Sequence, residues 1–135
     1  QRATANINCR IFPGNSIESI QAKLKEIAAE PTLTIVKDDS GGQPGPASPL
    51  RPDVMKAVTD GIHARFPNVK VIPSMSAGAT DSMHFRGRGV PSYGIAPIFM
   101  KQSDQFAHGL NERTPLSELA PAVTYFRRVV AELSK

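Results

Sequence analysis

Apolar and polar residues alternate along the first segment of the chain, residues 3–12, with the sequence ATANINCRIF. The apolar positions of this segment are Ala3, Ala5, Ile7, Cys9 and Ile11. A period of two is typical of a half-buried β-strand, and Pro13-Gly14 predicts the turn that ends it. A second strand is predicted at residues 32–37, because the sequence TLTIVK is rich in β-branched residues.

Between these two segments the apolar positions take helical spacing. They are Ile17, Ile20, Leu24 and Ile27. Asn15 is predicted as the N-cap, Glu18 three residues later completes a capping box, and Pro31 closes the helix. Residues 1–40 are therefore predicted to form a strand–helix–strand unit.

The following stretch, residues 38–52, is rich in Gly, Pro and Ser and has no helical or strand period. Such a composition is typical of a linker or crossover. We interpret it as a boundary between two domains, residues 1–40 and 41–135, and keep a plain surface loop as the alternative.

Beyond this stretch, helical and strand patterns alternate, which is typical of an α/β layer. The predicted elements are a helix at about 52–66, a strand at 69–73, a helical stretch from Asp81 to about Arg86, a strand at 91–97 and a helix at 119–133. Pro52 suits a first helical turn. Pro121 is placed in the first turn of the last helix, because an interior proline costs about 3 kcal/mol.

The last helix has a regular apolar stripe. Its members are Leu119, Val123, Phe126, Val130 and Leu133. We expect this stripe to face the core.

Composition narrows the function classes. Hydrophobic residues make up 40% of the 135 residues, enough to build a core, and the net charge of +4 comes from scattered Lys and Arg. The sequence has no long run of basic residues of the kind that indicates a nucleic-acid interface, so a nucleic-acid-binding function ranks last. The lone thiol of Cys9 cannot form an internal disulfide and is predicted to be a small buried apolar residue.

Targeting signals are not visible. No apolar stretch approaches the ~20 residues that a membrane helix needs, so no membrane partner is predicted, and no signal peptide is recognisable. The chain opens with Gln1 rather than Met and passes almost directly into a predicted strand. We expect it to be a piece of a longer protein, which leaves its compartment, cytoplasmic or exported, open.

Two loops carry the residues suited to chemistry. Gly78-Ala79-Thr80-Asp81 follows one predicted strand, and His108-Gly109-Leu110-Asn111-Glu112 follows another. Because ligands bind outside the carboxyl ends of strands in open α/β sheets, we expect both loops to converge on one crevice. His108 is a candidate metal ligand, acid or base, against the alternative of an ordinary surface histidine.

The neighbours of these residues have two interpretations each. Glu112 can accept a hydrogen bond from a metal-bound imidazole or cap the last helix. Asp81 is by itself most simply an N-cap. Gly78 leaves backbone N–H groups open to a substrate carboxylate.

These residues do not complete an active site. A catalytic zinc needs about three protein ligands, and His108 is the one convincing candidate in the sequence. No His-Glu-x-x-His, Gly-x-Ser-x-Gly or phosphate-loop motif occurs. The residues alone therefore predict an α/β piece with half of a site.

Three motifs in order give the chain a family resemblance. They are ANINCRIFPGNSIESI, AGATDSMHFRGRGVPSYGIAP and AHGLNERTPLSEL. The chain resembles the C-terminal portion of metallopeptidase family twenty, which contains carboxypeptidase G, aminoacylase, succinyl-diaminopimelate desuccinylase and the Gly-X carboxypeptidases. The resemblance covers nearly the whole sequence.

The resemblance implies a fold and an activity. It implies the last part of a zinc-peptidase catalytic domain, a mixed sheet with flanking helices, plus half of an α+β ferredoxin-like lid that joins two copies into a homodimer. It also implies a two-zinc amidohydrolase that cleaves an amide next to a free carboxylate, in a peptide or N-acyl amino acid. The fragment alone would be inactive, with the other zinc ligands upstream of Gln1.

Residue roles follow from the same resemblance. His108 matches the last zinc ligand, Gly78 and Arg10 match substrate-binding positions, and Asp81 and Glu112 match positions that support the ligands. Some relatives carry an arginine where this chain has Met83, which leaves the substrate open. The alternative is a non-catalytic module that dimerises or binds carboxylates without metal.

Overall fold

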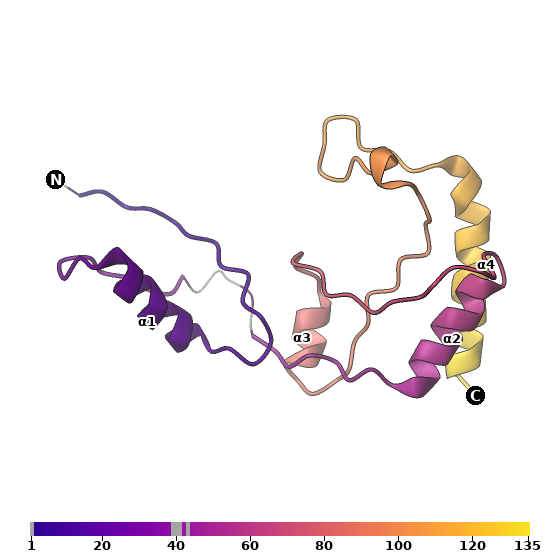
Figure 1. Ribbon diagram of the computed structural model, residues 1–135, viewed down its shortest axis with the longest axis horizontal. Coiled ribbons are helices and arrows are strands. Elements are labelled where there is room, and N and C mark those ends of the chain that lie inside the picture. The colour runs from indigo at the N-terminus through magenta and orange to yellow at the C-terminus, as the bar shows by residue number, and fades with distance from the viewer. Residues whose placement is uncertain (1, 39–41, 43) are drawn as a thin grey trace. The chain divides into compact units, whose positions relative to one another are not determined.

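The structure is a computed structural model that describes residues 2–38, 42 and 44–135. Helices are the regular elements of this part of the chain (Figure 1). They are α1 Ile17–Ala28, α2 Pro52–His63, α3 Ser82–Arg86, η1 Gln102–Asp104, η2 Leu116–Glu118 and α4 Leu119–Leu133, where η marks a 3₁₀-helix. The helices predicted from periodicity are thus confirmed, with α2 ending three residues earlier than expected.

The predicted fold class is wrong. Residues 2–38, 42 and 44–135 contain no β-strand, so they form neither the mixed sheet nor the ferredoxin-like lid. The four segments predicted as strands, 3–12, 32–37, 69–73 and 91–97, have no regular structure apart from turn residue 32. Alternation of side chains makes a segment suited to a sheet, but a strand also needs a neighbour to pair its N–H and C=O groups. These segments form no such ladder within the described chain.

The chain divides into two compact units. Unit 1 comprises the described residues of 1–49 and 75–93, and unit 2 comprises residues 50–74 and 94–135. The predicted domain boundary between residues 40 and 41 lies outside the described residues. No helix in the described part of the chain is long and apolar enough to cross a bilayer.

Unit 2 has a core between α2 and α4. The buried hydrophobic side chains are Val54, Ala57, Ala122, Tyr125 and Val129. Gly61 of α2 makes this packing possible, because a Cβ at that position would lie 2.9 Å from the Tyr125 ring. Each helix thus contributes one complementary face, a notch on α2 and an aromatic ring on α4.

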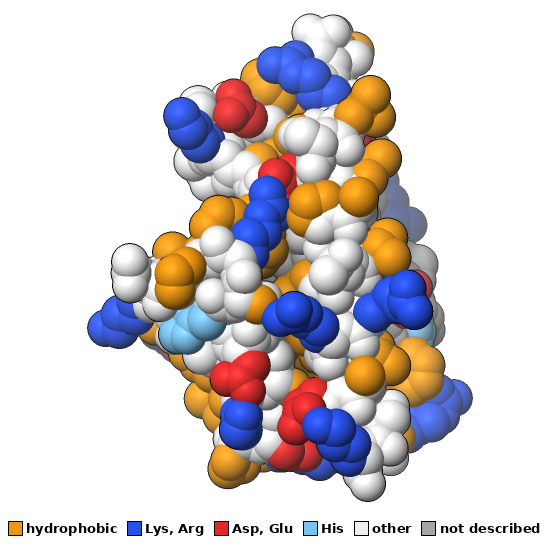
Figure 2. Space-filling model, turned by 90° about the vertical axis from the view of Figure 1, so that its right-hand side faces the viewer, with side chains coloured by type: hydrophobic (Ala, Val, Ile, Leu, Met, Phe, Trp, Pro, Cys, Tyr) orange, Lys and Arg blue, Asp and Glu red, His pale blue; other side chains and the backbone are white. Residues whose placement is uncertain are grey.

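The stripe predicted to face the core on α4 lies at the surface. Leu119, Val123, Phe126, Val130 and Leu133 are 42–59% exposed, whereas Ala122, Tyr125 and Val129 on the adjacent face are buried. Figure 2 shows the side of the structure on which α2 and α4 lie, with hydrophobic side chains lying between cationic ones. Both faces of α4 are apolar, so helical periodicity alone could not decide which one packs on α2.

Unit 1 has no buried residue among those described. Its helix α1 starts at a local cap, because the Ser16 side chain accepts a hydrogen bond from the Ser19 N–H at 3.0 Å. The predicted cap, Asn15, instead donates to the Phe12 carbonyl across the Pro13-Gly14 turn. Gly14 has a φ of 92°, which explains glycine at that position.

Candidate functional site

The two ends of the loop that carries His108 are both connected to one buried carboxylate, that of Glu118. We call residues 100–117 the His108 loop; it follows Phe99 and leads into Glu118, both in unit 2. The Phe99 N–H donates to Glu118 Oε2 at 3.3 Å. The two stems of the loop are therefore joined by a direct hydrogen bond.

Arg65, just beyond α2, completes this junction. Its Nη1 and Nη2 atoms donate to the two carboxylate oxygens of Glu118, each at 2.6 Å. Glu118 is only 9% exposed. The contact is a bidentate, charge-assisted pair, the strong form of this interaction.

The electrostatics agree with this geometry. The Arg65 guanidinium holds the pKa of Glu118 below its ordinary value; burial opposes this shift, and the Phe99 N–H adds to it. The hydrogen bonds to Glu118 in turn raise the pKa of Arg65. Glu118 is therefore ionised near neutral pH and acts as a fixed anion at the base of the loop.

Aromatic rings surround the junction. The Phe99 ring meets Phe66 edge-on at 5.4 Å and Tyr125 at 5.8 Å, measured between ring centroids. The Arg65 guanidinium lies over Phe66 at 4.8 Å. These contacts link the start of the His108 loop to the core between α2 and α4.

His108 itself has an unusual backbone. Its φ is 63°, in the left-handed region that a non-glycine residue seldom adopts. The His108 N–H donates to Glu112 Oε2 at 3.3 Å, and the Gly109 N–H donates to the Phe106 carbonyl at 3.0 Å. Glu112 thus holds the backbone of His108, a third possibility beside the two that the sequence suggested.

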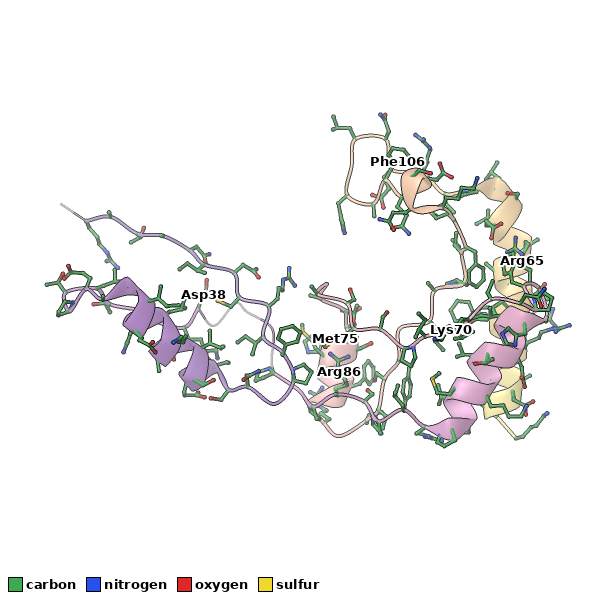
Figure 3. All side chains as sticks on the ribbon, viewed as in Figure 1. Asp38, Arg65, Lys70, Met75, Arg86 and Phe106 are labelled. Carbon is green, nitrogen blue, oxygen red and sulfur yellow. The ribbon has the colours of Figure 1, made fainter. Side chains whose placement is uncertain are left out.

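A second contact closes the tip of the loop. Figure 3 labels Phe106 on this loop. The Arg113 guanidinium lies 3.8 Å from the centroid of the Phe106 ring, a cation–π contact. Because these two residues flank His108 and Gly109, they pin both sides of the turn that carries the imidazole.

The described residues do not contain a complete donor set for a metal ion. His108 is exposed, and a neutral imidazole is a good zinc ligand. Within the described residues no three His, Cys, Asp or Glu side chains group closely enough to hold a metal ion. The exposed imidazole of His108 is thus suited to one ligand position of a zinc ion.

The other predicted site residues belong to unit 1. Arg10, Gly78 and Asp81 are all exposed. The Gly78 N–H donates to Ser76 Oγ at 3.0 Å. Asp81 occupies the N-cap position of α3, but its side chain makes no capping hydrogen bond. The structure brings His108 and Glu112 together, whereas their convergence with the Gly78–Asp81 loop stays a prediction.

Sequence reasoning missed Arg65 and Glu118. Glu118 is the last residue of η2 and directly precedes α4, and an acidic residue near the start of a helix is expected from the helix dipole alone. Nothing in the local pattern shows that it is buried or that its partner lies 53 positions away. A contact of such long range leaves no periodic signal in a single sequence.

The model of peptidase family M20/M25/M40 matches residues 2–132. The chain belongs to this family. The resemblance noted from three motifs is therefore confirmed over nearly the whole sequence.

Named relatives in the M20 family support the same assignment. "Probable carboxypeptidase S-like 2" of Dictyostelium discoideum is 25% identical over 134 residues, 98% of this chain and 26% of the relative. "N-fatty-acyl-amino acid synthase/hydrolase PM20D1" of Homo sapiens is 26% identical over 132 residues, 95% of this chain and 26% of the relative. The chain thus spans about a quarter of the length of these relatives. No solved structure gives a significant match.

Proposed function

We propose that the intact protein containing this chain is a zinc-dependent amidohydrolase that cleaves an amide bond next to a free carboxylate. The single observation that carries the proposal is His108, an exposed imidazole on a pinned left-handed turn within a chain of the M20 family. A strained backbone that holds one metal-binding side chain outward is typical of a functional position.

The substrate class rests on the relatives' names. One is named as a carboxypeptidase S-like protein and another as an N-fatty-acyl-amino acid synthase/hydrolase. A peptide cut at its C-terminal residue and an N-acyl amino acid share one feature, a carboxylate one carbon from the amide nitrogen. We therefore propose that the intact protein accepts peptides or N-acyl amino acids.

The proposed cofactor is a pair of zinc ions. Bound zinc would polarise the substrate carbonyl and lower the pKa of a water molecule to near neutrality. His108 would supply one imidazole ligand, and its backbone would be kept in place by Glu112. Donors outside these 135 residues would supply the rest, so the chain alone would hold no complete site and would be inactive.

Other residues would recognise the substrate. Arg10 would donate a charge-assisted fork to the carboxylate. The Gly78 N–H, which donates to Ser76 Oγ in this structure, would donate to the substrate carboxylate instead. Asp81, at the start of α3, would support the loop that carries Gly78. Dimerisation through the N-terminal region of the chain is part of the same proposal.

The test is an activity assay of the intact protein with zinc, using N-acyl amino acids and dipeptides. The expected result is hydrolysis of at least one class, lost after chelation and restored by zinc. His108→Ala should abolish it. If the zinc-loaded intact protein hydrolyses neither class, the proposal is wrong and the alternative, a module that binds carboxylates or dimerises without catalysis, takes its place.

A further inference from the structure

The geometry at the base of the His108 loop points to a positioning role that none of the predicted site residues has. The loop leaves the core after Phe99 and returns at Glu118, and the Phe99 N–H bonds directly to Glu118 Oε2. A loop whose ends are joined in this way keeps a defined orientation, whereas free ends would let the whole loop pivot.

Glu118 is a costly residue to bury. An acidic side chain in the interior is stable only when its charge is paired and hydrogen-bonded. Here the fork of Arg65 takes both oxygens, and Phe99 provides a third donor. Removing the Arg65 fork would leave a carboxylate that must seek water, and the Phe99 stem would lose its partner with it.

The tip of the loop has contacts of its own. Arg113 stacks on Phe106 at 3.8 Å, and the turn at His108 is closed by Glu112 and by the Gly109-to-Phe106 bond. These contacts fix the shape of the turn, so a shift of the stems would also shift the imidazole. A metal ligand has to be held to within about 0.5 Å of its productive position.

We propose that the Arg65–Glu118 pair is a positioning clip that aims His108, acting through the Phe99 stem of the loop. The clip touches neither substrate nor metal. Its relevance to zinc rests on the proposed function, but its effect on the order of the loop does not.

The experiment compares three variants of the intact protein. Glu118→Gln keeps the shape of the side chain but removes its charge, and Arg65→Lys keeps the charge but cannot form the fork. The matched control is Asp60→Asn, which removes a carboxylate from an exposed ion pair with Lys56 on α2 of the same unit. Backbone hydrogen exchange of residues 99–113 reports loop order, and competition with a chelator reports the zinc dissociation constant.

The clip predicts faster backbone exchange at Phe99 and at the His108–Glu112 turn in both clip variants, Glu118→Gln and Arg65→Lys. In the control, the exchange rates at these positions should equal those of the wild type. The clip also predicts zinc binding about 10-fold weaker in the two clip variants, the lower end of the effect known for residues that orient metal ligands. If Glu118→Gln does not fold, Arg65→Lys decides the question.

Two outcomes separate the clip from the proposed function. If the clip variants lower thermal stability but leave loop exchange and zinc affinity equal to those of Asp60→Asn, the pair is only structural and the clip is overturned. If zinc affinity does not respond even to His108→Ala, the proposed zinc role fails. The exchange measurement then still decides whether the clip orders the loop.

Discussion

Different interactions stabilise unit 1 and unit 2 internally. Unit 2 contains every buried residue that the structure describes, most of them packed between α2 and α4, whereas the described residues of unit 1 include none. In unit 1, α1 depends on the Ser16 cap and on the Gly14 turn before it. Side-chain packing defines unit 2, whereas the described part of unit 1 relies on hydrogen bonds, among them the cap of α1 and the bonds between Ser48 and Ser92.

This difference bears on function. His108, the proposed zinc ligand, sits on a loop whose stems reach the packed core through Phe99 and Glu118. Arg10 and Gly78, the proposed substrate contacts, lie on exposed segments of unit 1. The proposed zinc ligand is thus attached to the unit that has a packed core, and the proposed substrate contacts lie on the unit that has no buried residue among those described.

The largest expected effect comes from opening the core of unit 2. Val129 is 2% exposed and Val130 is 57% exposed, so the two make a matched pair on α4. Val129→Ala should lower the free energy of unfolding by about 2 kcal/mol, because it removes buried methyl groups and leaves a cavity. Val130→Ala should change it by less than about 0.5 kcal/mol. Urea unfolding of the 135-residue chain measures both, and equal losses would contradict the assignment of the packed face.

The next effect tests the notch on α2. Gly61→Ala would place a Cβ 2.9 Å from the Tyr125 ring and 3.2 Å from Val129 Cγ2. Overpacking of this kind costs about 1–3 kcal/mol, partly offset by the better helix propensity of alanine. Gly94→Ala is the control, since a Cβ there meets nothing within 4 Å. A stable Gly61→Ala variant would show that α2 and α4 are farther apart than described.

A smaller effect is expected in unit 1, where the cap of α1 can be removed. Ser16→Ala loses the hydrogen bond to the Ser19 N–H and should weaken α1 by about 1 kcal/mol. Asn15→Ala, at the position that the sequence suggested as the cap, should have less effect. Amide exchange along α1 distinguishes the two, and the reverse order would restore Asn15 as the cap.

The smallest effect is the dependence of stability on pH. The folded pKa of Glu118 lies below its ordinary value of 4.5, so its contribution to stability is complete above that value. As the pH falls through the folded pKa, this contribution is lost. The effect is modest because the Arg65 side chain is 34% exposed and water screens the pair. The measurement is thermal unfolding at several pH values between 7 and 3. The difference in unfolding temperature between the wild type and Glu118→Gln should become smaller as the pH falls. A difference that does not change with pH would exclude this linkage.

The sequence predicted the helices because their signals are local. Pro52 marks the first residue of α2, and Pro121 falls in the first turn of α4, as expected. The exposed position of His108 also agrees with a loop histidine, although its left-handed φ carries no clear sequence signal beyond the neighbouring glycine.

Predictions that depended on distant partners failed. Alternation at residues 3–12 could not show whether a second strand would pair with the segment. The two apolar faces of α4 could not be ranked without knowing that Gly61 opens a notch for Tyr125. The burial of Glu118 depends on Arg65, which is far away in the sequence. The roles of Arg10, Gly78 and Asp81 stay predictions.

The most direct test of the central claim, that His108 binds zinc, is the metal content of the intact protein. His84, an exposed histidine on α3, provides the matched control. Purified with limiting zinc and analysed by elemental mass spectrometry, His108→Ala should lose at least one zinc ion per chain, whereas His84→Ala should retain the wild-type content. Wild-type zinc content in His108→Ala would contradict the account.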